Sequence, residues 1–118
     1  MILRNIFISA AIALTAAMPM AAVAEPDSRE AERYTREAEQ YQRQARRYQN
    51  EAEQYQRQAE RYLNEAAQYV RSANMDRAQA QIGYARTAID NYRTYRRYAD
   101  NEQQKADESL RRARNALR

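Results

Sequence analysis

The chain of 118 residues contains no cysteine, no histidine and no tryptophan, and it has one glycine and two prolines. Without histidine and cysteine it lacks the commonest general base, the commonest metal ligand and the thiol nucleophile, and it can form no disulfide. A single glycine also excludes a glycine-rich phosphate-binding loop. These absences argue against catalysis. We therefore expect a protein that is not an enzyme and that binds no metal, no cofactor and no small-molecule substrate.

The segment from Met1 to Ala24 differs in composition from the rest of the chain. Arg4 gives a short positive start, an apolar run covers residues 6–18, and residues 22–24 (Ala-Val-Ala) match a cleavage pattern. This arrangement is typical of a secretory signal peptide, so we expect cleavage after Ala24 and a protein that is periplasmic in a bacterium, or secreted. The alternative is an uncleaved membrane anchor, which Pro19 and the short apolar run disfavour, because a spanning helix needs about 20 apolar residues.

Cleavage would leave 94 of the 118 residues, with a net charge of +3 in place of +4, because Arg4 is the only charged residue lost. The remaining chain has tyrosine as its only aromatic residue type and only seven large aliphatic side chains. These are Leu63, Val70, Met75, Ile82, Ile89, Leu110 and Leu117. Such a chain cannot build a thick globular core, and it can bury only a thin seam between helices.

Alanine and tyrosine recur every seven residues in the first half of this remaining chain. The alanines are Ala31, Ala38, Ala45, Ala52, Ala59 and Ala66, and the tyrosines are Tyr34, Tyr41, Tyr48, Tyr55, Tyr62 and Tyr69. A second alanine row follows, at Ala78, Ala85, Ala99, Ala106 and Ala113, with Tyr92 in the same register. Its companion row holds Ile82, Ile89, Arg96, Gln103, Leu110 and Leu117. Sustained heptads predict long helices that pack along a narrow seam.

Short polar residues mark the helix ends. The expected elements are a first helix at about 28–72, a turn at about 73–76 and a second helix at about 77–117. Asp27 is the expected N-cap of the first helix. Asn74 is the residue expected to adopt the left-handed conformation at the end of that helix, and Asp76 is the expected N-cap of the second. The domain organisation is thus a signal peptide at 1–24 followed by one helical domain at 25–118.

The two alanine rows predict how the chain folds back on itself. A reversal near residue 74 brings together residues whose numbers add to about 147–148. The alanine row of the first helix then faces the bulky row of the second, as Ala59 faces Ile89, and the tyrosine row faces the second alanine row, as Tyr62 faces Ala85. Large residues opposite small ones fill a narrow interface without voids. We therefore expect an all-α fold, a long antiparallel two-helix coiled-coil hairpin. One continuous helix in a parallel dimer or trimer is the alternative.

Two basic features of the second helix are candidate partner-binding surfaces. The first is the segment of Tyr92, Arg93, Tyr95, Arg96, Arg97 and Tyr98, and the second is the cluster of Arg111, Arg112 and Arg114. The segment suits either a contact within an oligomer or a patch that binds a client protein through Arg–Tyr cation–π contacts. The cluster suits either simple complementation of the negative end of the helix dipole or attraction to an anionic membrane surface or polymer.

The sequence thus favours an exported structural or interaction protein of the bacterial cell envelope, without catalytic activity. Its expected partners are proteins, either further copies of itself or envelope proteins. The alternative is a chaperone-like or envelope-binding module that uses the basic Tyr/Arg face of the second helix. Arginine and tyrosine would also suit nucleic acid, but an export signal argues against that partner.

Overall fold

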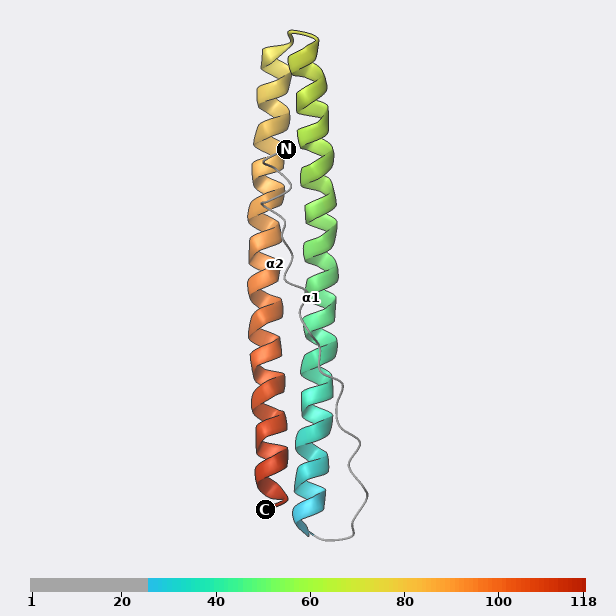
Figure 1. Ribbon diagram of the computed structural model, residues 1–118, viewed down its shortest axis with the longest axis vertical. Coiled ribbons are helices and arrows are strands. Elements are labelled where there is room, and N and C mark those ends of the chain that lie inside the picture. Colours follow the sequence, from blue (N-terminus) through green and yellow to red (C-terminus); the bar gives the residue numbers. More distant parts are fainter. Residues whose placement is uncertain (1–25) are drawn as a thin grey trace. The chain divides into compact units, whose positions relative to one another are not determined.

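The computed structural model describes residues 26–118, with side chains from residue 28 onward, and these residues form two α-helices and no strand. Helix α1 spans Pro26–Arg71 and helix α2 spans Met75–Ala116 (Figure 1). Each of these four ends lies within two residues of the position expected from the sequence. The expected signal peptide and the expected capping side chain of Asp27 lie outside the part of the chain that is described.

The two helices run antiparallel and pack against each other, which confirms the predicted all-α helical hairpin. The break between Arg71 and Met75 excludes one continuous helix. The described residues divide into two compact units. One unit, here called the turn unit, is Tyr48–Arg97, and the other, the terminal unit, combines residues 26–47 with Tyr98–Arg118. Each unit consists of one stretch of α1 and one stretch of α2.

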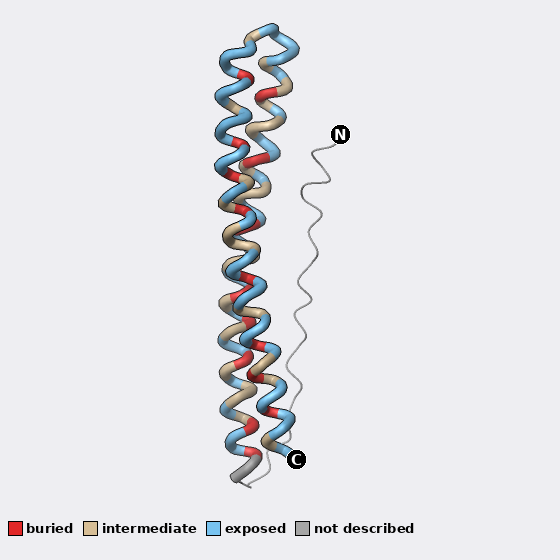
Figure 2. The backbone as a smooth tube through the Cα atoms, turned by 90° about the vertical axis from the view of Figure 1, so that its left-hand side faces the viewer, coloured by how far each residue is buried: buried red, intermediate tan, exposed pale blue. Residues whose placement is uncertain are grey.

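Alanine forms the interior of both units. Among the residues whose side chains are described, thirteen hydrophobic residues are buried, and all of them are alanine except Tyr92. They include every member of both alanine rows, and Ala88 in addition. Figure 2 shows buried residues recurring along each helix on the side that faces the other helix. Because alanine has only a methyl group, such rows let two helices approach closely along their whole contact.

The predicted pairing of alanine with bulky residues is wrong in part. Ile82 is 36% exposed and Leu117 is 53% exposed, so neither fills the space beside the alanine row of α1. The row three residues after each alanine of α2 contributes buried residues in their place, namely Ala88 and Ser109. The physical reason is that alanine occupies the middle of both helices. Little space for a large side chain therefore remains between them. Tyr92 is the buried exception, and the other large residues lie along the two flanks of the seam.

A Schellman motif ends α1. The N–H of Asn74 donates to the carbonyl of Tyr69 at 2.8 Å, and the N–H of Ala73 donates to the carbonyl of Val70 at 3.0 Å. Ala73 has a φ of 58°, so Ala73 is the left-handed residue, and the expectation of Asn74 at this position is wrong.

Asn74 caps the start of α2 instead. Its Oδ1 accepts a hydrogen bond from the N–H of Arg77 at 3.3 Å, and its carbonyl accepts from the N–H of Ala78 at 3.1 Å. This is the geometry of an N-cap residue, so the expected cap at Asp76 is also wrong. Asp76 lies in the first turn of α2, where its negative charge complements the helix dipole. Since one residue both completes the end of α1 and caps α2, the connection needs only residues 72–74.

Candidate functional site

The Tyr/Arg segment of α2, residues 92–98, contains both buried and exposed side chains. Tyr92 is 8% exposed and belongs to a core cluster with Ala52, Ala59 and Ala88. Its side chain is therefore buried between the two helices of the turn unit, and it presents little surface to a partner. As predicted from its place in the alanine row, Tyr92 points toward the other helix.

Tyr95 also belongs to the packing of the turn unit. Its ring lies against two tyrosines of α1, with a centroid distance of 5.5 Å to Tyr55 at an interplanar angle of 21°, and 6.1 Å to Tyr48. Tyr84 and Tyr62 form a similar pair at 5.5 Å. The sequence placed Tyr95 in a candidate partner-binding surface. In the turn unit this ring instead covers the edge of the alanine seam, because a ring on the flank can lean across to the facing helix.

The remaining members of the segment reach the surface to different degrees. Arg93 and Arg97 are exposed and lie four residues apart, on one face of α2. Neither forms an ion pair with another described residue. Arg96 is half-buried, and Tyr98, which belongs to the terminal unit, is 44% exposed. The accessible cations of this segment are therefore mainly Arg93 and Arg97.

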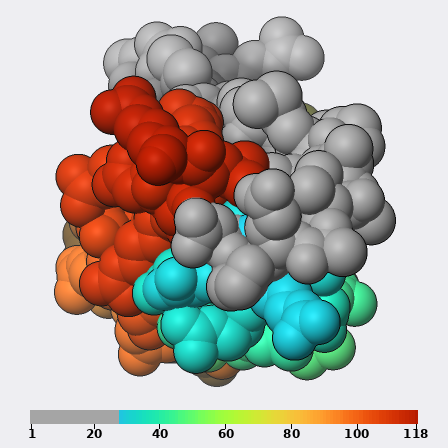
Figure 3. Space-filling model, turned by 90° about the horizontal axis from the view of Figure 1, so that it is seen from below, coloured from blue at the N-terminus to red at the C-terminus, as the bar shows by residue number. Residues whose placement is uncertain are grey.

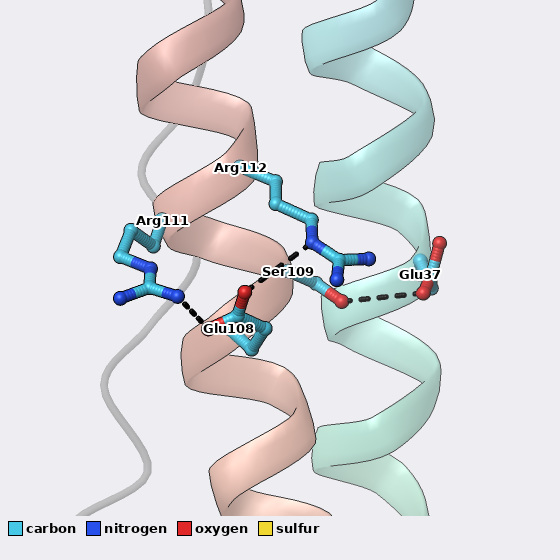
Figure 4. Close-up of polar contacts among 5 residues, drawn as sticks. All are labelled: Glu37, Glu108, Ser109, Arg111 and Arg112. Carbon is cyan, nitrogen blue, oxygen red and sulfur yellow. Dashed lines mark hydrogen bonds and ion pairs between the residues drawn. The ribbon is translucent and has the colours of Figure 1, made fainter.

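The C-terminal cluster is organised around one carboxylate. Glu108 accepts a hydrogen bond from Arg111 and pairs with Nε of Arg112 at 3.3 Å (Figure 4). The hydrogen bond from Arg111 lowers the pKa of Glu108 below its ordinary value, and the charges of Arg111 and Arg112 act in the same direction against desolvation. The same hydrogen bond raises the pKa of Arg111.

Both arginines keep most of their surface in water. The side chains of Arg111 and Arg112 are 68% and 54% exposed, so they remain available to anionic groups. Arg114 is exposed in the last turn of α2, where a cation complements the helix dipole. Figure 3 shows this end of α2 beside the first turns of α1 within the terminal unit.

Two polar contacts between the helices of the terminal unit were missed by sequence reasoning. The hydroxyl of Ser109 donates to Oε1 of Glu37 at 3.4 Å, and Nζ of Lys105 lies 5.8 Å from the centroid of the Tyr41 ring. The predicted register of the two helices could have identified both contacts. The residue numbers add to 146 in each pair, close to the predicted 147–148.

The described residues contain no cluster suited to a metal ion, and the depression on their surface is open and polar. They contain no group of three or more metal-ligating residues. An open depression of about 370 Å³ lies on one helix and is lined by Gln40, Arg43, Gln44 and Arg47. Its lining is polar and comes from one face of α1, which is unlike an enclosed, largely apolar substrate pocket.

Comparison with known proteins gives no family and no relative: no protein family, no curated protein and no solved structure matches the chain. Within the part of the chain that the structure describes, neither helix has a stretch apolar enough to span a bilayer.

Proposed function

We propose that the chain is an exported interaction protein of the bacterial cell envelope that has no catalytic activity. The observation that carries this proposal is the composition of the interior. Within residues 28–118, alanine and Tyr92 make up the buried hydrophobic residues, while most arginines and carboxylates point outward. A protein built in this way offers partners a charged helical surface and keeps no enclosed chamber for a substrate. The proposed export rests on the composition of the segment from Met1 to Ala24.

Binding in this proposal depends on charges held at helical spacing. Arg93 and Arg97 lie about 6 Å apart along the axis of α2, at 1.5 Å per residue. Arg111 and Arg112 form a second group of cations in the terminal unit. Interactions between exposed charges weaken as salt rises, because the Debye length falls from about 10 Å at 0.1 M to about 3 Å at 1 M. The partners should therefore dissociate at high salt.

Cell fractionation tests the proposal directly. The tagged protein should be recovered from the periplasm or the envelope, with Glu25 as its N-terminal residue in mass spectrometry. It should bring envelope proteins or further copies of itself through purification at low salt, and it should lose the envelope proteins at high salt. Recovery from the cytoplasm with the segment from Met1 to Ala24 intact would contradict it.

The second candidate function is a chaperone-like or envelope-binding module that acts through the basic face of α2. The exposure of Arg93 and Arg97, and the lack of an ion pair from either to a described residue, favour it. A double variant with Arg93→Ala and Arg97→Ala tests it, because Arg96 is half-buried and its removal would also disturb the hairpin. Arg43→Ala with Arg47→Ala is the matched control, since these arginines are exposed at the same spacing on α1.

Vesicles containing anionic phospholipid and unfolded client proteins are the two probes for this second candidate. Loss of binding in the α2 variant alone would support it and would locate the binding face. Equal loss in both variants would indicate a general effect of net charge. Unchanged binding in both would remove the basic face of α2 as the binding surface.

A further inference from the structure

The turn unit carries aliphatic side chains on the side away from its tyrosines. The contacts of Tyr55, Tyr62 and Tyr69 with α2 define one side of the alanine seam. In α1 the tyrosines follow each alanine by three residues, and residues that follow by four project to the other side of the seam, because each residue turns a helix by about 100°. The row on this second side holds Leu63 and Val70 in α1. The equivalent row of α2 holds Met75, Ile82 and Ile89.

These five residues, here called the aliphatic patch, are conspicuous in so polar a chain. They are five of the seven large aliphatic side chains that follow Ala24. Val70, Met75 and Ile82 are 50%, 53% and 36% exposed, while Leu63 and Ile89 are half-buried. Contiguous exposed aliphatic surface is unfavourable in water and commonly marks an interface.

Charges of opposite sign border the aliphatic patch along its two edges. Glu53 and Glu60 follow Ala52 and Ala59 by one residue and project beside the patch from α1. Arg86 and Arg93 follow Ala85 and Tyr92 by one residue and project beside it from α2. All four are exposed, and none forms an ion pair with another described residue. The charges nearest the patch are therefore acidic on one edge and basic on the other, while Arg57 and Asp90, five residues after Ala52 and Ala85, project farther from it.

The acidic and basic residues also lie at matching levels along the helices. In the contacts of Tyr62 with Tyr84 and of Tyr69 with Arg77, the two residue numbers add to 146. The numbers of Glu60 and Arg86 add to 146 as well, and so do those of Glu53 and Arg93. Glu60 is therefore level with Arg86, and Glu53 is level with Arg93.

We propose that the aliphatic patch of the turn unit binds the same patch on a second copy of this chain, with a two-fold axis parallel to the helices. That axis places α1 of each copy over α2 of the other, so that the apolar rows meet at the centre and Glu53 and Glu60 face Arg93 and Arg86 on both edges. An axis across the helices would place acidic edge on acidic edge. The charges thus select the second copy as occupant and fix its direction, because like charges would oppose the other arrangement.

This inference rests on the proposed function, because it names a second copy of the chain as one of the partners of the interaction protein. It can fail separately. If the protein is monomeric and still purifies with envelope proteins, self-association through the patch is wrong and the proposed function stands. If it is monomeric and cytoplasmic, both are wrong.

Charge exchange provides the sharpest test, with sedimentation of the purified protein as the measurement. One variant carries Glu53→Arg and Glu60→Arg, and the other carries Arg86→Glu and Arg93→Glu. Each alone should dimerise roughly a hundredfold more weakly than the wild type, because four attractive pairs become repulsive. An equimolar mixture should recover the dimer as a heterodimer, since every facing pair is then of opposite sign. The variant with all four exchanges should dimerise like the wild type.

A second variant separates apolar contact from charge. Ile82→Gln should abolish the dimer and leave the helical content unchanged, because Ile82 is already partly exposed in the hairpin. Leu117→Gln is the matched control, since Leu117 is exposed in the terminal unit outside the patch, and it should leave the dimer intact.

A spin label at Thr94→Cys reports the direction of the second copy, and the chain has no other cysteine that could react. Thr94 follows Ile82 of the patch by a little over three helical turns, so the two labelled positions in the proposed dimer should be level, with their backbones about 20 Å apart or less and the label linkers adding to that distance. An opposed arrangement would separate them by about 36 Å along the helices. A wild-type protein that stays monomeric, a mixture that fails to recover the dimer, or the longer distance would overturn the inference.

Discussion

The turn unit and the terminal unit share the same alanine rows and differ in what lies beside them. In the turn unit, Tyr55 and Tyr48 contact Tyr95, and Tyr62 contacts Tyr84 across the seam. In the terminal unit, the side-chain contacts across the seam include Ser109 with Glu37 and Lys105 with Tyr41, and five ion pairs lie along its helix surfaces.

This difference separates two roles of the repeat. The alanine rows set how closely the helices approach, and they do so alike in both units. The flanking residues decide how strongly each unit is held. A pair of aromatic rings contributes about 0.5–1.5 kcal/mol beyond its buried area, whereas an exposed ion pair contributes about 0–1 kcal/mol. The turn unit should therefore be the more stable of the two.

The largest effect is expected from overfilling the alanine seam. Ala59→Leu in the turn unit should lower the free energy of unfolding by about 3 kcal/mol, because Ala59 has no exposed surface and the added atoms must separate the helices. Ala106→Leu in the terminal unit should lower it by about 1 kcal/mol, because the helix ends there can move apart with less loss of contact. Thermal unfolding followed by circular dichroism measures both.

Ala80→Leu serves as the control for this pair, since Ala80 is exposed on α2 and its enlargement should change the free energy of unfolding by about 0.5 kcal/mol or less. Equal losses at Ala59 and Ala106 would contradict the proposed difference between the units. A loss at Ala80 as large as that at Ala59 would contradict the assignment of the seam itself.

A smaller effect is expected when the rings of the turn unit are removed. Tyr95→Ala should lower the free energy of unfolding by about 2 kcal/mol, since the ring is half-buried and contacts both Tyr48 and Tyr55. A double-mutant cycle of Tyr55→Ala with Tyr95→Ala should give a coupling of about 1 kcal/mol. The same cycle with Tyr69→Ala should be additive, because the Tyr69 ring lies against Arg77 near the turn.

In the turn unit, a glycine stands where alanine would fit better, and an alanine stands where glycine would fit better. Gly83 lies within α2, with open space where a Cβ would project, and Ala73 has a positive φ. Gly83→Ala and Ala73→Gly should each raise the free energy of unfolding by about 1 kcal/mol. Denaturant titration of the single and double variants measures the two gains, which should add. A loss of stability in Ala73→Gly would contradict the left-handed conformation at the turn.

The smallest expected effect is the pH dependence of the stability that Glu108 contributes to the terminal unit. Because Arg111 holds the pKa of Glu108 below its ordinary value, the pairing stabilises the folded state above that ordinary value, near 4.5, and is lost as the pH falls through the lowered pKa. Glu108→Gln should therefore lower the unfolding temperature slightly at pH 7 and leave it unchanged at pH 2. Comparison of the two melting curves at low and high salt checks the sign, since salt should reduce the difference at pH 7. An equal difference at both pH values would contradict the role of the carboxylate.

The heptads were sufficient to predict the hairpin, its helix ends to within two residues and its register to within about two. They were insufficient for the flanks. A period of seven identifies the row that faces the partner helix. It does not tell which flanking row is buried, the one three residues later or the one four residues later, because that depends on how closely the helices approach. For that reason Ala88 and Ser109 were missed and Ile82 was placed too deep.

For the candidate binding residues as well, the sequence pattern predicts which residues are charged but not how each side chain packs. Composition singled out Tyr92 and Tyr95 as part of a surface, although Tyr92 is buried, as its place in the alanine row predicts, and Tyr95 lies against α1. Arg93 and Arg97 could be predicted as exposed, because charged side chains remain in water. Nothing in the order of residues distinguishes a tyrosine that leans across a seam from one that faces a partner.

The short connection at Ser72–Asn74 also constrains how such a protein can change length. Since every heptad of the α1 row and all but one of the α2 row offer the same alanine methyl, loss of seven residues from α1 alone would let the shortened arm slide along α2 and still find alanines opposite alanines at most positions. The tyrosine pairs and the Glu37–Ser109 contact would then be lost, because their partners would no longer lie at the same level along the helices. Insertions and deletions should therefore persist in evolution as compensated pairs, one in each arm at the same distance from the bend.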